Sequence, residues 1–182
     1  MLPGDDIEAR FRISETISIE PLASKHSVEL LETVNANRKR LANYLPWTDF
    51  VTNRREAGYY ISQRVNSHAV DAYWFAIYFE DCFAGVIGSK GVDPETRTTE
   101  IAYWLADHGR GNQLIDQALS ILILYLKKKG NAQSIQFHCL EENIPSIRIA
   151  ERSGAKLKHY LDHDFDMLDR SQRLGVYELP LT

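Results

Sequence analysis

One long helix, set between two strand-like segments, constrains this chain more than any other feature. Residues 112–129 (NQLIDQALSILILYLKKK) carry apolar side chains on almost every side of a helix, so both sides of that helix must be buried. The flanking segments, Thr98–Leu105 and Ser134–Leu140, have the composition of strands. A strand, a helix and a second strand in succession predict a right-handed crossover between parallel strands. We therefore expect the long helix to cover one face of a sheet.

Other segments surround this crossover with further strands and helices. The expected strands are Thr16–Leu22, Ala72–Phe79, Cys82–Lys90, Lys156–Leu161 and Arg173–Leu179. The expected helices are 24–40, 53–67 and 143–153, capped by Ser24, by Asn53 or Thr52, and by Asn143. Strands, paired helices and a meander in this order predict an α/β (α+β) fold, a mixed sheet of about seven strands with helices on both faces.

Length, charge and hydropathy exclude several classes of protein. The 182 residues predict one domain, 1–182, with residues 1–12 as an N-terminal extension and a candidate flexible segment. A net charge of −4 gives no basic footprint, so we expect no nucleic-acid partner. The most apolar run, 118–126, is far shorter than the ~20 residues of a membrane span. The acidic start, MLPGDDIEAR, lacks the apolar core of a signal peptide, and we expect a cytoplasmic protein with no membrane partner.

Cysteines and histidines are too few and too scattered for a metal site. Cys82 and Cys139 form no CxxC pair, and His159 and His163 have no third ligand at metal spacing. We therefore expect no metal. Cys139 follows His138, and adjacent strand residues point to opposite faces. A Cys–His nucleophile is thus excluded, and Cys139 is interpreted as a buried thiol.

The stretch with the most chemical information is 100–118 (EIAYWLADHGRGNQLIDQA). A strand enters a glycine-bearing loop that opens the long helix, and the free backbone N–H groups of a helix start favour an anion. Glycine lets a phosphate approach the backbone closely. Taken alone, the pattern favours a simple strand-to-helix turn.

Three segments together resemble a known family. EIAYWLADHGRGNQL (100–114) is similar to the acetyl-CoA loop of the GNAT N-acetyltransferase superfamily, in particular the RimJ/RimL branch, which acetylates the N-termini of ribosomal proteins. The stretch from Asn143 to Ala155 (NIPSIRIAERSGA) resembles the N-x-x-S-x-x-x-x-E-R-x-G-F segment of that branch, and NRKRLANYLPW (37–47) resembles its N-R-x-x-L-x-x-W-L-P-W segment. The segments follow the family's order from Thr16 to Leu179. The resemblance implies a mostly antiparallel, twisted sheet and acetyl-CoA as cosubstrate.

The resemblance also assigns residues to the cofactor. The expected acetyl-CoA contacts are Tyr103, Trp104, Leu105, Arg110, Gly111, Asn112, Gln113, Leu114 and Asn143. The family's pyrophosphate signature, Gln/Arg-x-x-Gly-x-Gly/Ala, stands here as His108, Gly111 and Gln113, so the central glycine alone is kept. Backbone N–H groups do not depend on the side chain, and Arg110 is a candidate phosphate partner. Gln113 is expected in the first helical turn, where it either crowds the phosphate or points to solvent.

Acyl transfer from a thioester to an amine needs a neutral amine and a protonated or stabilised leaving thiolate. Glu100 is the candidate base, since it shares a strand face with Trp104; a salt-bridged strand carboxylate is the equally weighted alternative. Ser146 is the candidate acid for the sulfur, because the matching serine is given this role in RimL-type enzymes. Its alternative role, together with Asn143, is simply to cap its helix.

The acceptor is less constrained by the sequence than the cofactor. The LPW resemblance places Asn35, Arg38, Tyr44 and Trp47 along an acceptor groove, although Trp47 is equally typical of a core. An α-amine, with a pKa of about 7.7–8.0, is easier to deprotonate than a lysine at about 10.4. The resemblance implies a protein N-terminus as acceptor. The alternatives are a small amine such as a polyamine or an aminoglycoside, or a non-catalytic acyl-CoA-binding regulator. A homodimer would cover the outer side of the long helix.

Overall fold

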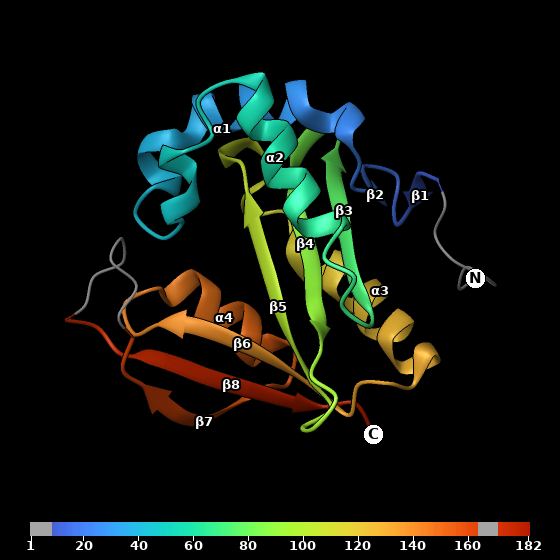
Figure 1. Ribbon diagram of the computed structural model, residues 1–182, viewed down its shortest axis with the longest axis vertical. Helices are drawn as coiled ribbons and strands as arrows, with labels where there is room; N and C mark the ends of the chain where they lie inside the picture. Colours follow the sequence, from blue (N-terminus) through green and yellow to red (C-terminus); the bar gives the residue numbers. More distant parts are fainter. Residues whose placement is uncertain (1–8, 164–170) are drawn as a thin grey trace.

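The computed structural model describes residues 9–163 and 171–182. One eight-stranded sheet in the order β1-β2-β3-β4-β5-β6-β8-β7 forms its centre (Figure 1). All neighbouring strands are antiparallel except β5 and β6. The predicted fold class, a mixed and mostly antiparallel sheet with helices, is confirmed.

The strands are β1 (Phe11–Arg12), β2 (Ile17–Pro21), β3 (Ala72–Phe79), β4 (Cys82–Val92), β5 (Thr98–Leu105), β6 (Ser134–Leu140), β7 (Lys156–Leu161) and β8 (Leu174–Pro180). The α-helices are α1 (Ser27–Leu41), α2 (Arg54–Val65), α3 (Leu114–Lys129) and α4 (Ile144–Arg152). Short 3-10 turns, η1 (Ser24–His26), η2 (Pro46–Asp49) and η3 (Asp107–Gly109), complete the described elements.

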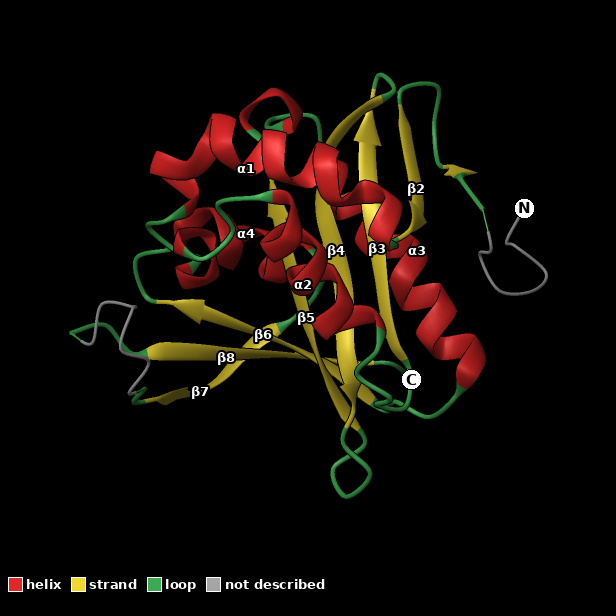
Figure 2. Ribbon diagram, turned by 45° about the horizontal axis from the view of Figure 1, so that its top comes forward, coloured by secondary structure: helices red, strands yellow, loops and turns green. Residues whose placement is uncertain are grey.

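Two hydrophobic cores lie on opposite faces of the sheet, as Figure 2 shows by the helices in front of it and behind it. The α3 side buries Leu119, Leu122 and Leu126 against sheet residues such as Ile101. The other core contains residues of α1 and α2 together with Trp104 from β5. The alternation predicted for β5 is therefore confirmed, because residues 101 and 104, an odd number of positions apart, belong to opposite cores. Helices on both faces are likewise confirmed.

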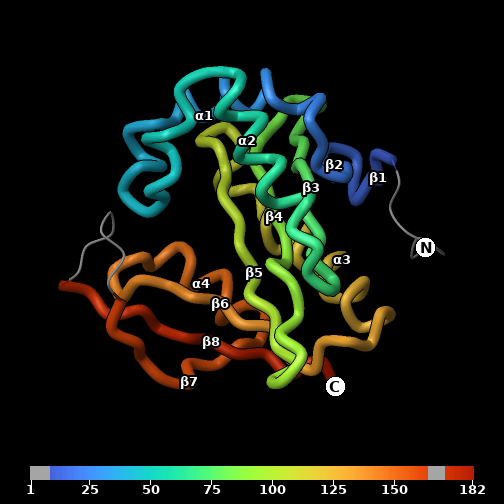
Figure 3. The backbone as a smooth tube through the Cα atoms, in the orientation of Figure 1, coloured from blue at the N-terminus to red at the C-terminus, as the bar shows by residue number. Residues whose placement is uncertain are grey.

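The parallel strands β5 and β6 stay together for a short distance. Their register runs from Thr98–Ser134 to Glu100–Gln136, and beyond that point the two strands diverge (Figures 1 and 3). Residues 101–105 of β5 and 137–140 of β6 do not pair with each other, and we call the gap between them the β5–β6 split. Because β5 pairs with β4 along its other edge, the edge that faces the split has no neighbouring strand.

Two local predictions near the N-terminus differ from the structure. An eighth strand, β1, pairs Phe11 with Ile19; it is only two residues long, too short for a periodic signal, and residues 1–8 of the expected N-terminal extension lie outside the described residues. Ser24 begins a 3-10 turn instead of capping α1, because Nδ1 of His26 accepts the Ala23 N–H at 2.9 Å and closes that turn. The caps at Asn53 and Asn143 are confirmed by side-chain hydrogen bonds.

The long helix begins two residues later than predicted, at Leu114. Gln113 has φ 56°, which is left-handed and cannot continue the helix. The helix ends as expected, with three lysines in its last turn and Gly130 at φ 74°. Among the described residues, no helix is both long and apolar enough to cross a membrane.

Candidate functional site

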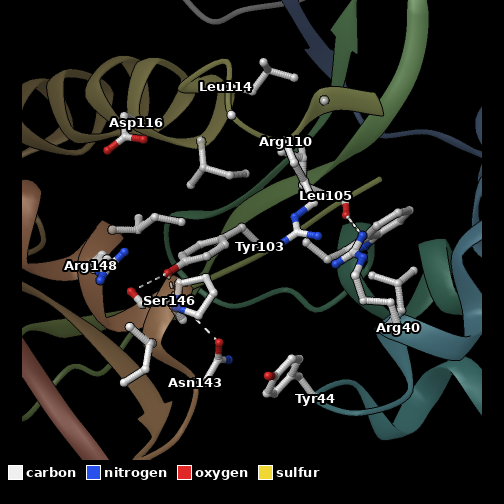
Figure 4. A pocket seen from close by; sticks show the side chains of 18 of the residues that line it. Arg40, Tyr44, Tyr103, Leu105, Arg110, Leu114, Asp116, Asn143, Ser146 and Arg148 are labelled. Carbon is white, nitrogen blue, oxygen red and sulfur yellow. Dashed lines mark hydrogen bonds between the residues drawn. The ribbon is translucent and has the colours of Figure 1, made fainter. Parts of the chain in front are cut away.

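A cavity of about 810 Å³ opens at the start of α3 and the start of α4. The lining comes from β5, the loop after it, both helix starts and the end of α1, as seen from close by in Figure 4. Of the predicted cofactor contacts, the cavity wall includes Tyr103, Trp104, Leu105, Arg110, Gly111, Gln113, Leu114 and Asn143. The split therefore opens into a cavity of a size typical of small-molecule sites.

Asn112 is the predicted cofactor contact that is absent from this wall. Its side-chain amide donates to the carbonyl oxygens of Arg110 at 3.0 Å and Gly109 at 3.4 Å. These bonds close the loop onto itself. Asn112 thus shapes the loop, and its neighbours form the surface of the cavity.

The loop before α3 presents a row of free backbone donors. Among the described residues, the backbone N–H groups from Gly111 to Asp116 donate no hydrogen bond to backbone outside the helix. The first hydrogen bond of α3 is donated by the Gln117 N–H to the Gln113 carbonyl oxygen. Gly111 has φ 79°, and an added Cβ there would meet no atom within 4 Å. The structure therefore leaves open space beside a glycine with free N–H groups, which is the geometry of an anion cradle.

Positive charge surrounds this cradle. Four arginines, Arg40, Arg110, Arg148 and Arg152, line the cavity. Arg152 forms a two-pronged ion pair with Asp116 at 2.8 and 2.9 Å, which fastens α4 to α3. Arg148 has no ion-pair partner among the described residues. The excess of cations favours a ligand that carries several negative charges.

Arg40 reaches the far end of β5 from α1. Its Nη2 donates to the carbonyl oxygen of Leu105 at 2.5 Å, and its Nε lies 2.5 Å from Oδ1 of Asp107. The Leu105 carbonyl points away from β4, because the next residue, Ala106, is the one whose N–H bonds to β4 at Ala84. By the same alternation the backbone of Tyr103 faces the split. The edge of β5 can therefore hydrogen-bond an extended ligand as a further strand would.

Ser146 lies at the inner end of the cavity, in the first turn of α4. The Tyr103 hydroxyl is 2.8 Å from Ser146 Oγ, and Cys139 Sγ is 3.2 Å from the same oxygen. Burial raises the pKa of both Tyr103 and Cys139, so both stay protonated near neutral pH. Asn143 Oδ1 accepts the Ser146 N–H at 3.4 Å. Ser146 therefore belongs to a helix cap and is also part of a hydroxyl cluster in the cavity.

Glu100 lies outside the cavity wall. Its Oε1 is 2.6 Å from Lys90 Nζ on β4, and its Oε2 is 3.7 Å from His138 Nδ1 on β6. The structure thus records the salt-bridged carboxylate that was one of two interpretations, with a lysine as partner. It stands on the α1/α2 side of the sheet, the face opposite Ser146.

The four predicted acceptor residues differ in their surroundings. Tyr44 lines the cavity, whereas Trp47 packs on Tyr60 at 4.3 Å between ring centroids. Arg38 donates to the carbonyl oxygens of Thr48 and, at 2.6 Å, Val51. It also donates to Oδ1 of Asn35 at 2.6 Å. The bonds of Arg38 hold the η2 segment against α1.

The comparisons with known proteins agree on one family. A family model described as an acetyltransferase (GNAT) domain matches residues 17–156. The chain belongs to the GNAT acetyltransferase family. The chain is 29% identical over 167 residues to the ribosomal-protein-serine acetyltransferase of Escherichia coli strain K12, covering 91% of this chain and 93% of the relative. The predicted resemblance to the RimJ/RimL branch is confirmed.

Solved GNAT structures share the fold over nearly the whole chain. RimL, a ribosomal L7/L12 alpha-N-protein acetyltransferase in complex with coenzyme A, superposes with a TM-score of 0.84 at 19% identity, covering 94% of this chain and 97% of that one. The microcin C7 self-immunity acetyltransferase MccE, in complex with acetyl-CoA and AMP, gives 0.84 at 22% identity, covering 98% of each chain. These likenesses establish the fold of this GNAT domain.

Four residues of the site lie outside the predicted set: Arg40, His138, Arg148 and Arg152. Arg148 and Arg152 are one helical turn apart on α4, which places both on one face, and this spacing is visible in the sequence. Arg40 and His138 come from α1 and β6 and meet β5 through the tertiary fold alone. Among the described residues, no group of three or more His, Cys, Asp or Glu could hold a metal ion.

Proposed function

We propose that this GNAT enzyme transfers acetyl from acetyl-CoA to the α-amino group of a protein N-terminus. The observation that supports acetyl-CoA as the acetyl donor is the anion cradle at Gly111. Its open space and free N–H groups adjoin the arginines of the cavity. The phosphates of coenzyme A are the polyanion that such a cradle fits. The named relatives bind coenzyme A or acetyl-CoA.

The rest of the donor fits the edge of β5. The pantetheine arm is extended and contains amides, so it can bond to the backbone of Tyr103 and Leu105 in the split. This directs the thioester toward Ser146. The Tyr103 hydroxyl lies 2.8 Å from Ser146 Oγ, and either oxygen can be the donor. With the protonated tyrosine as donor, the serine hydrogen is free to protonate the departing thiolate. Transfer is direct, because the acceptor nitrogen attacks the thioester and no acyl-enzyme is needed.

The acceptor class follows from the relatives and from amine chemistry. The Escherichia coli relative is named for ribosomal-protein serine, and RimL for the α-amine of L7/L12. At pH 7.5 an α-amine is neutral for about one molecule in three, whereas a lysine is neutral for about one in 800. A site without a strong base therefore favours the α-amine.

A panel of acceptors tests this function. The enzyme is mixed with acetyl-CoA and a peptide that begins with serine, a polyamine, or an aminoglycoside, and free thiol is followed with time. We expect thiol release with the peptide and little with the small amines. Release with a small amine alone would support the small-molecule alternative. Tight acetyl-CoA binding by calorimetry, with no release for any amine, would identify a regulator.

The variant Ser146→Ala tests the acid. Without the hydroxyl, the thiolate must leave unprotonated, and kcat is expected to fall by about 10²-fold, a typical loss for a general acid. The Kd for coenzyme A should stay unchanged. Ser120→Ala is the matched control, since that hydroxyl bonds within α3 to the Asp116 carbonyl. An unchanged kcat in Ser146→Ala would exclude the assigned role.

A further inference from the structure

A histidine stands at the opening of the split, on the face opposite Ser146. The β5–β6 pairing ends at Glu100–Gln136, and His138 lies two residues further along β6. Its neighbour Cys139 points the other way, where Sγ lies 3.2 Å from Ser146 Oγ. One residue of β6 therefore contacts the proposed acid from one side of the sheet, while His138 occupies the other side beside Glu100.

Hydrogen bonds determine which ring nitrogen of His138 carries the proton. Burial alone would raise the pKa of Glu178, but hydrogen bonds from Lys158 and Gln136 outweigh it and lower that pKa. Glu178 is therefore a carboxylate, which only accepts, so Gln136 donates its amide to it at 2.7 Å. The Gln136 Oε1 is left facing His138 Nε2 at 3.2 Å. The Nε2 must then be the protonated nitrogen.

The other ring nitrogen, Nδ1, is consequently a lone-pair acceptor. It lies 3.7 Å from Oε2 of Glu100, which is too far for a direct hydrogen bond. Two acceptors at this separation can share one N–H donor between them. The Oε1 of the same carboxylate is held by Lys90 at 2.6 Å, which fixes Glu100 in place. The pair therefore offers two acceptor atoms to one amine N–H.

The charges around His138 favour its neutral form at rest. Burial lowers its pKa, Glu100 on β5 raises it, and Lys90 on β4 and His159 on β7 lower it further, with a net lowering below 6.5. The side chain is still 25% exposed, so a proton taken up at Nδ1 can leave to solvent. The imidazole is thus a free base at neutral pH with a route for proton release.

We infer that His138 accepts the proton of the incoming amine at Nδ1, and that Glu100 positions this amine and balances the imidazolium charge. The inference rests on the proposed acetyl transfer. It assigns the base to a residue outside the cofactor motif. Glu100 is then a positioning residue. Its ion pair with Lys90 holds the carboxylate in place for that role.

The proton and bond changes balance as follows. The acceptor ammonium gives one proton to His138 Nδ1 and becomes a neutral amine. Its nitrogen forms a bond to the thioester carbon, the C–S bond breaks, and the sulfur takes its proton from Ser146. The nitrogen's second proton restores the serine hydroxyl through solvent, and Nδ1 releases its own proton to solvent. One ammonium and one thioester give one amide, one thiol and one free proton.

Two variants separate this assignment from a base at Glu100. In wild type, kcat/KM should fall at low pH with an apparent pKa below 6.5, as His138 becomes protonated. His138→Gln should lower kcat/KM by about 10²- to 10⁴-fold and remove this acidic limb. Glu100→Gln should keep the limb but move it to lower pH, because loss of the carboxylate disfavours the imidazolium. His159→Gln is the control. It should keep the wild-type kcat/KM on the neutral plateau and move the limb to higher pH, because one influence that lowers the pKa of His138 is removed.

Control measurements separate loss of the base from loss of folding or of donor binding. Thermal unfolding and calorimetry with coenzyme A show whether the variants fold and bind the donor. The assignment to His138 is overturned if His138→Gln retains its rate and its acidic limb, or if Glu100→Gln alone removes the limb. Nitrogen NMR of the wild-type histidines needs no turnover, so it also applies if no amine is acetylated and the proposed function fails. It should show His138 with Nε2–H, whereas an Nδ1–H ring would contradict the inference.

Discussion

Two glycines at opposite ends of α3 provide a matched pair of substitutions. Gly111 has φ 79° and Gly130 has φ 74°, and an added Cβ meets no atom within 4 Å at either position. Alanine therefore introduces the same left-handed strain at both ends and no clash in the free protein. Gly111 lies in the cavity wall, and Gly130 does not. The pair separates backbone strain from loss of ligand space.

The expected magnitudes follow from this geometry. A non-glycine residue in the left-handed region costs about 1 kcal/mol, which for a chain of this size lowers Tm by about 2–4 °C. Both variants should show this loss. In Gly111→Ala the new methyl group also displaces a phosphate from the N–H groups, and one charged hydrogen bond contributes about 1.5–3 kcal/mol. The Kd for coenzyme A should therefore rise about 10- to 150-fold in this variant alone.

Thermal unfolding without ligand and titration calorimetry with coenzyme A measure the two effects independently. Gly111→Ala and Gly130→Ala should unfold at the same temperature and differ in Kd. Equal Kd values for Gly111→Ala and wild type would refute the cradle. A rise in Kd for Gly130→Ala as large as that for Gly111→Ala would mean that strain in α3, instead of the space at Gly111, controls binding.

Three further substitutions test other parts of the structure. Gln113→Gly should relieve the strain of φ 56° and raise the free energy of unfolding by up to about 1 kcal/mol, measured in urea; a loss of stability would contradict this. Tyr103→Phe removes the 2.8 Å bond to Ser146 Oγ, so kcat should fall about tenfold while the Kd for coenzyme A holds, and a changed Kd would oppose this role. Arg38→Ala should destabilise by about 1–3 kcal/mol, because the Val51 carbonyl loses its donor, and an unchanged urea midpoint would refute it.

The elements that could be predicted from the sequence are those whose apolar residues recur with a helical or strand period, because this period marks the buried face. The apolar α3 and the alternating β5 are long enough to show their patterns, and both are where the sequence places them. The pattern of apolar residues says nothing about φ, so the left-handed Gln113 and the later start of α3 could not be seen. The two-residue β1 (Phe11–Arg12) is held by pairing with β2 and has no periodicity of its own.

The residues of the candidate site also fall into a predictable group and an unpredictable group. Gly111, Asn143 and Ser146 lie within contiguous motifs, and the structure brings them to one cavity. Arg40 reaches β5 across 65 positions of sequence. His138 faces Glu100 because two parallel strands pair up to that point and then diverge. Such relations depend on register and divergence of strands, which a single sequence does not encode locally.

The position of the transferred acetyl group tests the central claim most directly. A peptide that begins with serine and contains one internal lysine is incubated with the enzyme and acetyl-CoA, and tandem mass spectrometry locates the added acetyl. We predict one acetyl group, on the N-terminal nitrogen, with the lysine unmodified. Acetylation of the lysine in preference to the α-amine would contradict the proposed function.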